Sequence, residues 1–270
     1  MVTVTSFLQI ILTCFILKVV FSDGLPPSIK PSQTPTLFHH EILKPNSPYE
    51  ELGKSRLRSP PPPASPPPPP SFDHFKLALT WPQTFCKIEN CFYPLPQKFV
   101  IHGLWPNKVG DTDIRDCQVG KEEKTQKLNT IRKTLEKDWP SLIKDRHGNQ
   151  NWANDVLWLK QWNSHGTCSI QMFEFLSYFE ETLKVYNRYN IKDILEKSNI
   201  KPGEVFKQKE YIDALKKHIN FTPQIRCEEI DHLYYLSEIR FCLTASKNLE
   251  YQDCANPYSG CNSKTKDVYF

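Results

Sequence analysis

The sequence predicts an α+β fold, a single disulfide-bonded domain with a central antiparallel sheet and several helices. Alternating apolar and polar residues, typical of strands, occur over 75–81 and 98–102 and return from residue 224 onward, most clearly over 233–243. Apolar residues at 3- and 4-residue spacings, typical of helices, fill the region between them. Helices and strands are thus segregated along the chain, which favours the α+β class.

The first 22 residues are expected to be a signal peptide. Residues 7–17 form an apolar run. Val20 and Ser22 have small side chains at positions −3 and −1 of a cleavage site before Asp23. The run is short and is followed by Lys18, which does not suit a membrane span. We therefore expect a mature protein that is soluble, secreted and extracellular, without a membrane span.

Residues 23–71 are expected to form a disordered, proline-rich tail. They contain 15 of the 23 Pro residues, and proline interrupts the hydrogen bonding of helices and sheets. In 59–63 and 65–70 a Ser precedes consecutive Pro residues, a pattern that favours polyproline II rods. One interpretation is a stiff spacer. The other is cell-wall association, because Ser followed by four Pro resembles the repeats of plant extensins.

Residues 72–270 are expected to fold as one domain. The strand 75–81 is stopped by Pro82, and the strand 98–102 precedes a long excursion over 107–150. The expected helices cover 128–139, the stretch around 156–165, 173–189, 191–195 and 208–218. Strands return from residue 224, and the last segment, from Asp253, is rich in loops.

Charge and cysteine content restrict the class of protein. The formal net charge is +4, of which residues 72–270 account for +2, so the basic charge is not concentrated in the folded domain. Eight cysteines behind a targeting sequence indicate disulfides and a secretory route. They form no C-x-x-C pair and no zinc-finger spacing with histidine, so no metal site is predicted. The pairing of eight cysteines stays open at this point.

Residues 156–168 place several polar side chains on one helix. Trp158 and Trp162 are i,i+4 neighbours that can anchor one helix face in a core. A polar stripe beside them consists of Lys160, Gln161, Ser164 and His165. The helix is expected to end at Gly166.

A second informative stretch is 99–106. A short apolar strand runs into His102 and is expected to end at the breaker Gly103 and at Trp105 with its following proline. Histidine titrates near neutral pH and suits both directions of proton transfer. His102 and His165 therefore suggest an acid–base pair, provided that the fold brings them together.

These two stretches resemble the two active-site motifs of the ribonuclease T2 family. Residues 101–106, Ile-His-Gly-Leu-Trp-Pro, match the first motif almost completely, and residues 158–168 match the second in frame. The resemblance covers about residues 72–270 and is greatest to the plant S-ribonucleases of pistil self-incompatibility. It implies a ribonuclease T2-like fold and a secreted endoribonuclease that needs no metal or other cofactor. Such an enzyme cleaves single-stranded RNA by transphosphorylation through a 2′,3′-cyclic phosphate.

The same resemblance implies the catalytic residues. His165 corresponds to the general base and His102 to the general acid, while Lys160 and Gln161 occupy the remaining catalytic positions. The family commonly has His at position 160, many members have Glu at position 161, and S-ribonucleases also have Gln there. Directly before the catalytic histidine it usually has Lys, where this chain has Ser164. Loss of that cation is expected to lower the rate about 10²- to 10³-fold, and we hypothesise that Lys160 partly compensates.

Further predictions concern substrate contacts, disulfides and glycosylation. Leu157, Trp158 and Trp105 are candidates for binding a base, because aromatic and apolar faces stack on bases, and core positions are the alternative. Asn220 begins the one N-glycosylation sequon, 220–222. The disulfides implied by the resemblance are Cys86–Cys91, Cys117–Cys168, Cys227–Cys261 and Cys242–Cys254.

Other functions remain open from the sequence. A catalytically weakened relative that binds RNA or a protein partner would explain Ser164, and a structural cell-wall protein would explain the proline-rich tail. For an active enzyme, the S-ribonuclease likeness implies entry into pollen tubes and F-box protein partners. Enzymes of phosphate starvation, defence or senescence are the alternative. The domain is expected to be a monomer.

Overall fold

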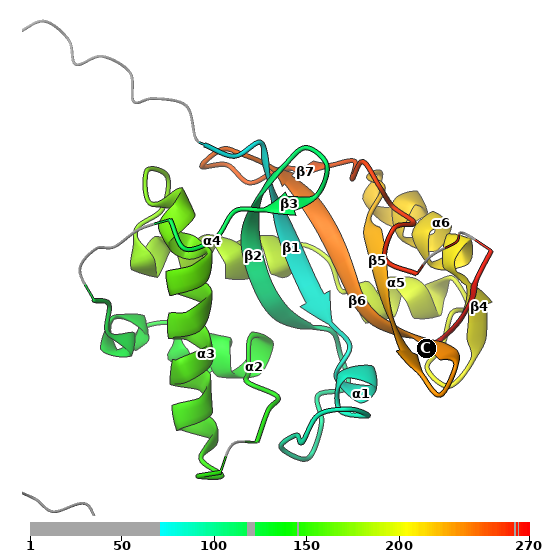
Figure 1. The fold of residues 1–270 in the computed structure, drawn as a ribbon, viewed down its shortest axis with the longest axis horizontal. Helices are drawn as coiled ribbons and strands as arrows, with labels where there is room; N and C mark the ends of the chain where they lie inside the picture. The colour runs from blue at the N-terminus through cyan, green and yellow to red at the C-terminus, as the bar shows by residue number, and fades with distance from the viewer. Residues whose placement is uncertain (1–70, 118–121, 145, 262, 264) are drawn as a thin grey trace, which may run out of the picture. The chain divides into compact units, whose positions relative to one another are not determined.

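The computed structural model describes residues 71–117, 122–144, 146–261, 263 and 265–270 (Figure 1). The expected signal peptide and proline-rich tail lie outside the described residues. The strands are β1 (His74–Thr80), β2 (Val100–Lys108), β3 (Thr112–Asp113), β4 (Val205–Lys207), β5 (Gln224–Ile230), β6 (Leu233–Thr244), β7 (Tyr251–Gln252) and β8 (Asp267–Tyr269). The helices are α1 (Pro82–Phe85), η1 (Thr125–Leu128), α2 (Arg132–Asp138), α3 (Gln150–Ser164), η2 (Gly166–Ser169), α4 (Phe175–Tyr186), α5 (Ile191–Lys197) and α6 (Gln208–Ile219). None of these helices is long and apolar enough to cross a membrane.

The strands form one mainly antiparallel sheet, which confirms the predicted α+β class. Along the sheet the order is β3-β2-β1-β6-β8-β4, and both β5 and β7 also pair with β6. Strands β1, β2 and β6 lie side by side at the centre of the domain (Figure 1). The exception to antiparallel pairing is β6 with β8, which are parallel at Tyr235 and Tyr269.

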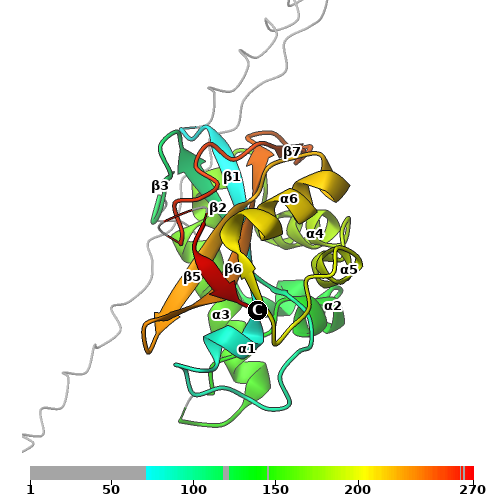
Figure 2. The same cartoon turned by 90° about the vertical axis from the view of Figure 1, so that its right-hand side faces the viewer.

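Helices α4, α5 and α6 lie on one side of the sheet, as Figure 2 shows. The opposite side of the sheet faces the viewer in Figure 1. On α4 the predicted apolar face is buried, with Phe175, Phe179 and Leu183 at most 5% exposed. On α3, Trp158 and Trp162 are 0% and 3% exposed, so the predicted i,i+4 pair anchors this helix in the core. The sheet therefore keeps one broad face on which side chains from several strands can form a site.

Two elements differ from the sequence prediction in a way that has a clear physical reason. The helix expected over 128–139 is divided into η1 and α2, because Ile131 has a non-helical backbone with φ −114° and ψ 3°. The strand expected to end at Gly103 continues to Lys108. Its pairing with β1 extends to Asn107, opposite His74, and this tertiary pairing outweighs the local breakers.

A β-bulge places His102 on the open face of the sheet. Ala78 pairs with Gly103 and Leu79 pairs with Ile101, so His102 is the extra residue of β2. Side chains along a regular strand alternate between the two faces, and a bulge shifts that alternation by one. As a result Ile101 and Leu104, three positions apart, are both buried in the core, while His102 and Trp105 line the open face.

All four predicted disulfides are present: Cys86–Cys91, Cys117–Cys168, Cys227–Cys261 and Cys242–Cys254. The Cys117–Cys168 bridge joins the segment after β3 to η2, directly behind the end of α3. It spans 51 positions of the sequence. A loop of that length is expected to give about 4 kcal/mol of stabilisation in the chain-entropy description.

Candidate active site

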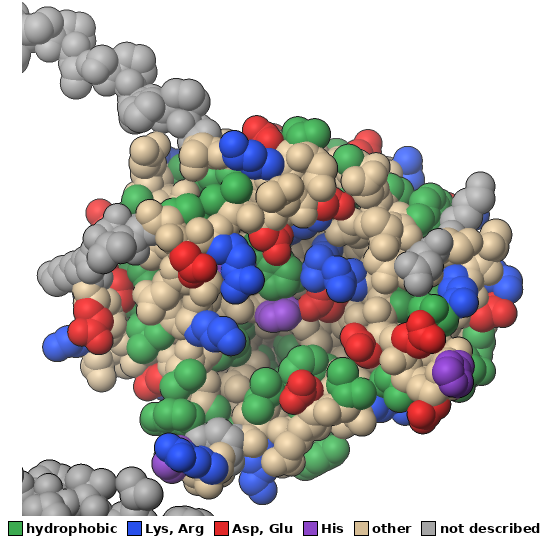
Figure 3. All heavy atoms as spheres, viewed as in Figure 1, with side chains coloured by type: hydrophobic (Ala, Val, Ile, Leu, Met, Phe, Trp, Pro, Cys, Tyr) green, Lys and Arg blue, Asp and Glu red, His purple; other side chains and the backbone are tan. Residues whose placement is uncertain are grey.

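A pocket of about 430 Å³ lies against β2, β6, the segment after β3 and α3. Figure 3 shows a hollow near the middle of the open face, with a histidine at its floor and Lys and Arg side chains around it. His102 and His165 both line the pocket. The fold therefore brings together the two histidines that the sequence placed on separate elements.

Glu238 of β6 holds the imidazole of His102. Its Oε1 lies 2.6 Å from Nδ1 of His102, and its Oε2 accepts a 2.8 Å hydrogen bond from Nε of Arg240. Burial by itself would raise the pKa of Glu238, but the hydrogen bonds and charges of His102 and Arg240 outweigh burial and hold this pKa at about 2. The ionised carboxylate can only accept, so Nδ1 of His102 carries a proton and Nε2 is left for a ligand.

Trp105 lies between the two histidines. Its ring centroid is 4.9 Å from that of His102 and 5.4 Å from that of His165. The indole Nε1 donates a 2.9 Å hydrogen bond to Oε1 of Gln161, and the guanidinium of Arg240 lies 5.1 Å from the ring. Trp105 is only 6% exposed, so it offers an edge to the pocket and mainly fixes the positions of its neighbours.

Gly103 is needed where β2 passes this hydrogen bond. A Cβ atom at this position would lie 2.1 Å from Nε1 of Trp105 and 2.3 Å from Oε1 of Gln161. Any side chain there would displace both groups, because heavy atoms do not approach that closely. The glycine of the first motif therefore allows strand β2 and helix α3 to meet.

His165 follows the last residue of α3 and is 7% exposed. Burial and the positive charges of Arg115 and His102 lower its pKa to about 4, against the opposing effects of Asp113 and the Ile114 backbone. Its Nδ1 is buried and makes no regular hydrogen bond to any residue that the structure describes. The ring is therefore neutral near pH 7 and is able to accept a proton.

The polar stripe predicted on α3 lines the pocket. Lys160, Gln161, Ser164 and His165 all contribute to the lining. Lys160 is exposed, and within the described part of the chain its ammonium has no ion-pair partner. The Oε1 of Gln161 is occupied by Trp105, which leaves the amide N–H groups of Gln161 for a ligand.

The structure separates the three residues expected to contact a base. Leu157 and Trp105 line the pocket, whereas Trp158 is fully buried and does not. The indole Nε1 of Trp158 donates a 2.9 Å hydrogen bond to the carbonyl of Trp139. The prediction of a substrate contact is therefore wrong for Trp158, because its neighbour Leu157 occupies the helix face toward the pocket.

Sequence motifs did not indicate five charged residues in or beside the pocket. Glu89, Asp113, Arg115 and Arg240 line the pocket, and Glu238 lies beside it as the partner of His102. A signal existed for Glu238 and Arg240, two charged residues spaced i,i+2 in an otherwise apolar strand, which places both on one face. No comparable pattern distinguishes Arg115, because it lies in a segment without regular periodicity.

The lining combines groups for proton transfer with groups that attract an anion. Lys160, Arg115 and Arg240 supply three cations, and Glu89 and Asp113 supply two exposed carboxylates. Among the residues that the structure describes, no group of three or more His, Cys, Asp or Glu could hold a metal ion. The arrangement suits acid–base chemistry on a substrate with a negatively charged group.

Comparison with known proteins identifies the class. The sequence model of the ribonuclease T2 family matches residues 72–254, which include both histidines and the two strands that carry His102 and Glu238. The chain therefore belongs to the ribonuclease T2 family and is an endoribonuclease of that type.

Two curated relatives are 30% identical to the chain. Ribonuclease S-2 of Antirrhinum hispanicum aligns over 195 residues, which is 69% of this chain and 78% of the relative. Ribonuclease 1 of Arabidopsis thaliana aligns over 162 residues, 58% of this chain and 68% of the relative. The chain is thus equally similar to a protein named as an S-ribonuclease and to a plant ribonuclease whose name does not include that designation.

Solved structures share the fold. Ribonuclease MC1 from bitter gourd seeds superposes with a TM-score of 0.65 at 26% identity, covering 74% of this chain and all of that one. The self-incompatibility-associated SF11 ribonuclease of Nicotiana alata gives 0.63 at 27% identity, covering 74% and 98%. Both coverages correspond to the folded domain, without the proline-rich segment.

Proposed function

We propose that the protein cleaves single-stranded RNA by metal-independent transphosphorylation, with His165 as general base and His102 as general acid. The observation that carries this proposal is that one pocket holds the two imidazoles in opposite environments. His165 is buried and has a pKa of about 4, whereas His102 has a 38% exposed side chain bound to an ionised carboxylate. Titratable groups in such unlike environments are the usual arrangement for an acid and a base.

The first step makes and breaks one bond at phosphorus. His165 takes the proton of the ribose 2′-hydroxyl, whose oxygen then attacks the phosphorus. The bond from phosphorus to the 5′-oxygen breaks, and Nε2 of His102 protonates that oxygen. The products are a 2′,3′-cyclic phosphate and a 5′-hydroxyl. Each proton transfer of this kind contributes about 10²- to 10⁴-fold in rate.

The second step hydrolyses the cyclic phosphate with the roles exchanged. After the first step His165 is protonated and His102 is neutral. His102 takes a proton from a water molecule, whose oxygen forms a bond to phosphorus. The bond from phosphorus to the 2′-oxygen breaks, and His165 returns its proton to that oxygen, which restores the starting state and leaves a 3′-phosphate. A bound phosphate also raises the pKa of His165, because its negative charge favours the protonated ring.

Lys160 and Gln161 are proposed to bind the phosphate. Among the described residues the ammonium of Lys160 has no ion-pair partner, and the amide of Gln161 is held by Trp105 while its N–H groups have no partner there. Lys160→Ala is expected to lower kcat/KM about 10- to 10²-fold, since a charged hydrogen bond contributes about 1.5–3 kcal/mol. An unchanged rate would contradict the hypothesis that Lys160 compensates for the family lysine.

Base binding is proposed for the apolar part of the pocket, with Leu157 and the edge of Trp105 as contacts. Related structures support a nucleotide ligand. Ribonuclease MC1 variants are known in complex with 5′-UMP and 5′-GMP, and ribonuclease NT in complex with 5′-AMP. Bases bind to such surfaces because their faces stack on apolar and aromatic side chains.

The direct test is RNA cleavage by the disulfide-bonded full chain in excess chelator, with identification of the product ends. We expect cyclic phosphate and 5′-hydroxyl ends, and their loss in His102→Ala and in His165→Ala. Lys217→Ala, an exposed residue of α6 that does not line the pocket, is the control for loss of a charge. Folded wild type that binds RNA without cleaving it would indicate instead a binding relative.

Processing is proposed to follow the sequence pattern, with cleavage after residue 22, secretion, and a tail over 23–71 preceding the catalytic domain 72–270. Asn220 is exposed at the C-terminal end of α6, which suits attachment of a glycan. Mass spectrometry of the secreted protein, before and after glycosidase treatment, would show the N-terminus and the occupancy of Asn220.

Pistil self-incompatibility is the biological role that we propose, with F-box proteins as partners. Its support is the likeness to ribonucleases S-2 and SF11 and the Gln at position 161. The identity to ribonuclease 1 of Arabidopsis is equal, and that relative is not named as an S-ribonuclease. We therefore retain a role in phosphate supply or defence as the alternative. High allelic variation and pistil-restricted expression would support the first role, and a single allele with expression induced by phosphate starvation would support the second.

A further inference from the structure

We propose that Arg115 is a further catalytic residue, whose guanidinium binds the reacting phosphate beside His165. This inference rests on the proposed RNA cleavage and deepens it. It concerns the one position of the second motif, Ser164, where the chain supplies a hydroxyl and no cation. The structure points to a residue from a distant segment, 49 positions earlier in the sequence, as the source of that charge.

The backbone around Arg115 is held against both catalytic elements. On one side, the amide of Ile114 donates a 2.9 Å hydrogen bond to the carbonyl of Pro106 in β2. On the other side, the amide of Asp116 donates a 2.8 Å hydrogen bond to the carbonyl of Ser164 in α3. The next residue, Cys117, forms the disulfide with Cys168. Arg115 thus lies between two short backbone contacts, one to the strand of His102 and one to the residue before His165.

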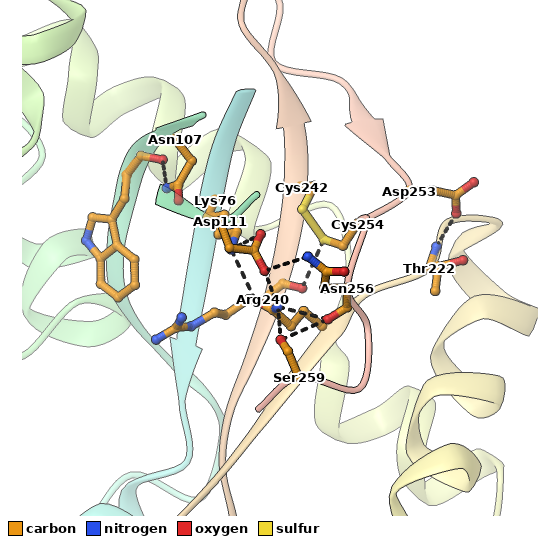
Figure 4. Close-up of a disulfide and its surroundings, with 12 residues drawn as sticks. Lys76, Asn107, Asp111, Thr222, Arg240, Cys242, Asp253, Cys254, Asn256 and Ser259 are labelled. Atoms are coloured by element: carbon orange, nitrogen blue, oxygen red, sulfur yellow. Dashed lines mark hydrogen bonds and ion pairs between the residues drawn. A yellow bond between two sulfur atoms is a disulfide. The ribbon is translucent and has the colours of Figure 1, made fainter. Parts of the chain in front are cut away.

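The turn that leads into this segment is also anchored. Asp111 accepts a 2.6 Å hydrogen bond from the ammonium of Lys76, which is 2% exposed, and a 2.9 Å bond from the amide of Gln224. Figure 4 shows Lys76, Asp111 and Asn256 together beside the Cys242–Cys254 disulfide. This charge pair fixes the local geometry, because the buried ammonium of Lys76 would be uncompensated without Asp111. The segment 111–117 is therefore attached to the domain at both ends.

The side chain of Arg115 is available for a ligand. It lines the pocket, and within the described residues its guanidinium makes no ion pair or hydrogen bond. Arg240, the other arginine of the pocket, is already bound to Glu238 at 2.6 Å. Of all charged groups, Arg115 also has the largest electrostatic effect on the pKa of His165. An unpaired cation held beside the general base is the expected arrangement for binding a phosphate next to that base.

A guanidinium suits this role chemically. Its planar fork donates two parallel hydrogen bonds to phosphate oxygens and keeps its charge at every accessible pH. As the 2′-oxygen attacks, negative charge accumulates on the non-bridging oxygens, and a fixed cation stabilises this state more than the ground state. The residue therefore contributes to kcat as well as to binding.

The test compares Arg115→Ala, Arg115→Lys and the double variant Arg115→Ala with Ser164→Lys, all in the disulfide-bonded full chain. We expect Arg115→Ala to lower kcat/KM on RNA about 10²- to 10³-fold. Ser164→Lys in the Arg115→Ala background is expected to restore most of the rate, because it returns a cation next to His165. The control Lys217→Ala removes one charge from outside the pocket and is expected to leave the rate unchanged.

Two further readouts separate a catalytic role from a structural one. The acidic limb of the pH profile is expected to move to higher pH in Arg115→Ala, because removal of the cation raises the pKa of His165. The affinity for inorganic phosphate, measured by calorimetry, is expected to fall about 10- to 10²-fold. Phosphate binding does not require turnover, so this result stands even if the wild type fails to cleave RNA and the proposed function is rejected. Unchanged phosphate affinity and rate in folded Arg115→Ala would overturn the inference.

Discussion

The two sides of the pocket hold their histidines by different means. On the sheet side, His102 is the extra residue of a bulge and is bound to the Glu238–Arg240 pair of the neighbouring strand. On the helix side, His165 is buried at the end of α3 and has no carboxylate partner among the described residues. Arg115 is the charged group with the largest effect on its pKa. The surroundings therefore determine whether a histidine donates or accepts a proton.

The largest expected effect is on the pH dependence of stability, because His165 and Glu238, on the two sides of the pocket, titrate over different pH ranges. The pKa of His165 is about 4 in the folded protein and has its ordinary value of 6.5 in the unfolded chain. Between these values the unfolded chain binds more protons, so the folded state loses stability as pH falls from 6.5 to 4. The full shift corresponds to about 3 kcal/mol. Denaturant unfolding of His165→Asn should show a flatter pH dependence in this window.

Glu238 provides the matched comparison at lower pH. Its pKa of about 2 lies below the ordinary value of 4.5, so its contribution is present above pH 4.5 and is lost as pH falls toward 2. Glu238→Gln should therefore flatten the pH dependence of stability below pH 4.5 and leave it unchanged between pH 6.5 and 4.5. Equal slopes for wild type and both variants would contradict the two assigned environments.

The pH dependence of activity follows from the same shift. The profile of kcat/KM reports the groups of the free enzyme, and His165 has to be neutral to accept a proton. We expect the acidic limb near pH 4, so that cleavage continues well below pH 6. An acidic limb at 6.5 or above, measured on a dinucleotide substrate, would show that the environment of His165 in solution differs from the one described.

Substitution of Glu238 tests the sheet side by itself. Glu238→Gln preserves the shape but removes the anionic acceptor of His102. The value of kcat/KM is expected to fall by less than the about 10²- to 10⁴-fold that proton transfer by the histidine itself contributes. Glu229→Gln, an exposed residue of β5, serves as the matched control. Full activity of a folded Glu238→Gln protein would mean that the carboxylate does not position the ring.

The smallest effect on rate is expected for substitutions in α3, where Trp158 is buried in the core and its neighbour Leu157 lines the pocket. Trp158→Phe should leave kcat/KM nearly unchanged and lower the free energy of unfolding by about 1–3 kcal/mol, through the lost hydrogen bond to Trp139 and the cavity. Leu157→Ala should instead raise KM a few-fold, because it removes an apolar wall of the pocket. A reversed pattern in kinetics and chemical denaturation would place Trp158 in the base site.

Local patterns predicted most of the fold. The i,i+4 pair Trp158 and Trp162, the apolar face of α4 and the long strand β6 all appear as expected, because each pattern arises from burial on one face. The pairing of the cysteines came from family resemblance, since spacing does not determine it. The bulge at His102 was missed, although the three-residue spacing of Ile101 and Leu104 does not fit a regular strand with both residues buried.

The site was predicted only where its residues lie within motifs. His102, His165, Lys160 and Gln161 fall in two short stretches, whereas Glu238 reaches His102 across 136 positions of the sequence. Such a contact depends on the order of β2, β1 and β6 in the sheet, which no local pattern encodes. Arg115 is positioned by backbone hydrogen bonds and a disulfide, and these depend on neither its own side chain nor a periodic pattern.

The central claim is that His165 is the base and His102 the acid, and the dependence on the leaving group tests it most directly. The measurement compares His102→Ala and His165→Ala on a dinucleotide and on a nucleoside 3′-(4-nitrophenyl phosphate), whose leaving group needs no proton. We expect His102→Ala to be severely impaired on the dinucleotide and to recover nearly full activity on the activated ester, while His165→Ala is impaired on both. Recovery of His165→Ala, with His102→Ala impaired on both substrates, would contradict the assignment.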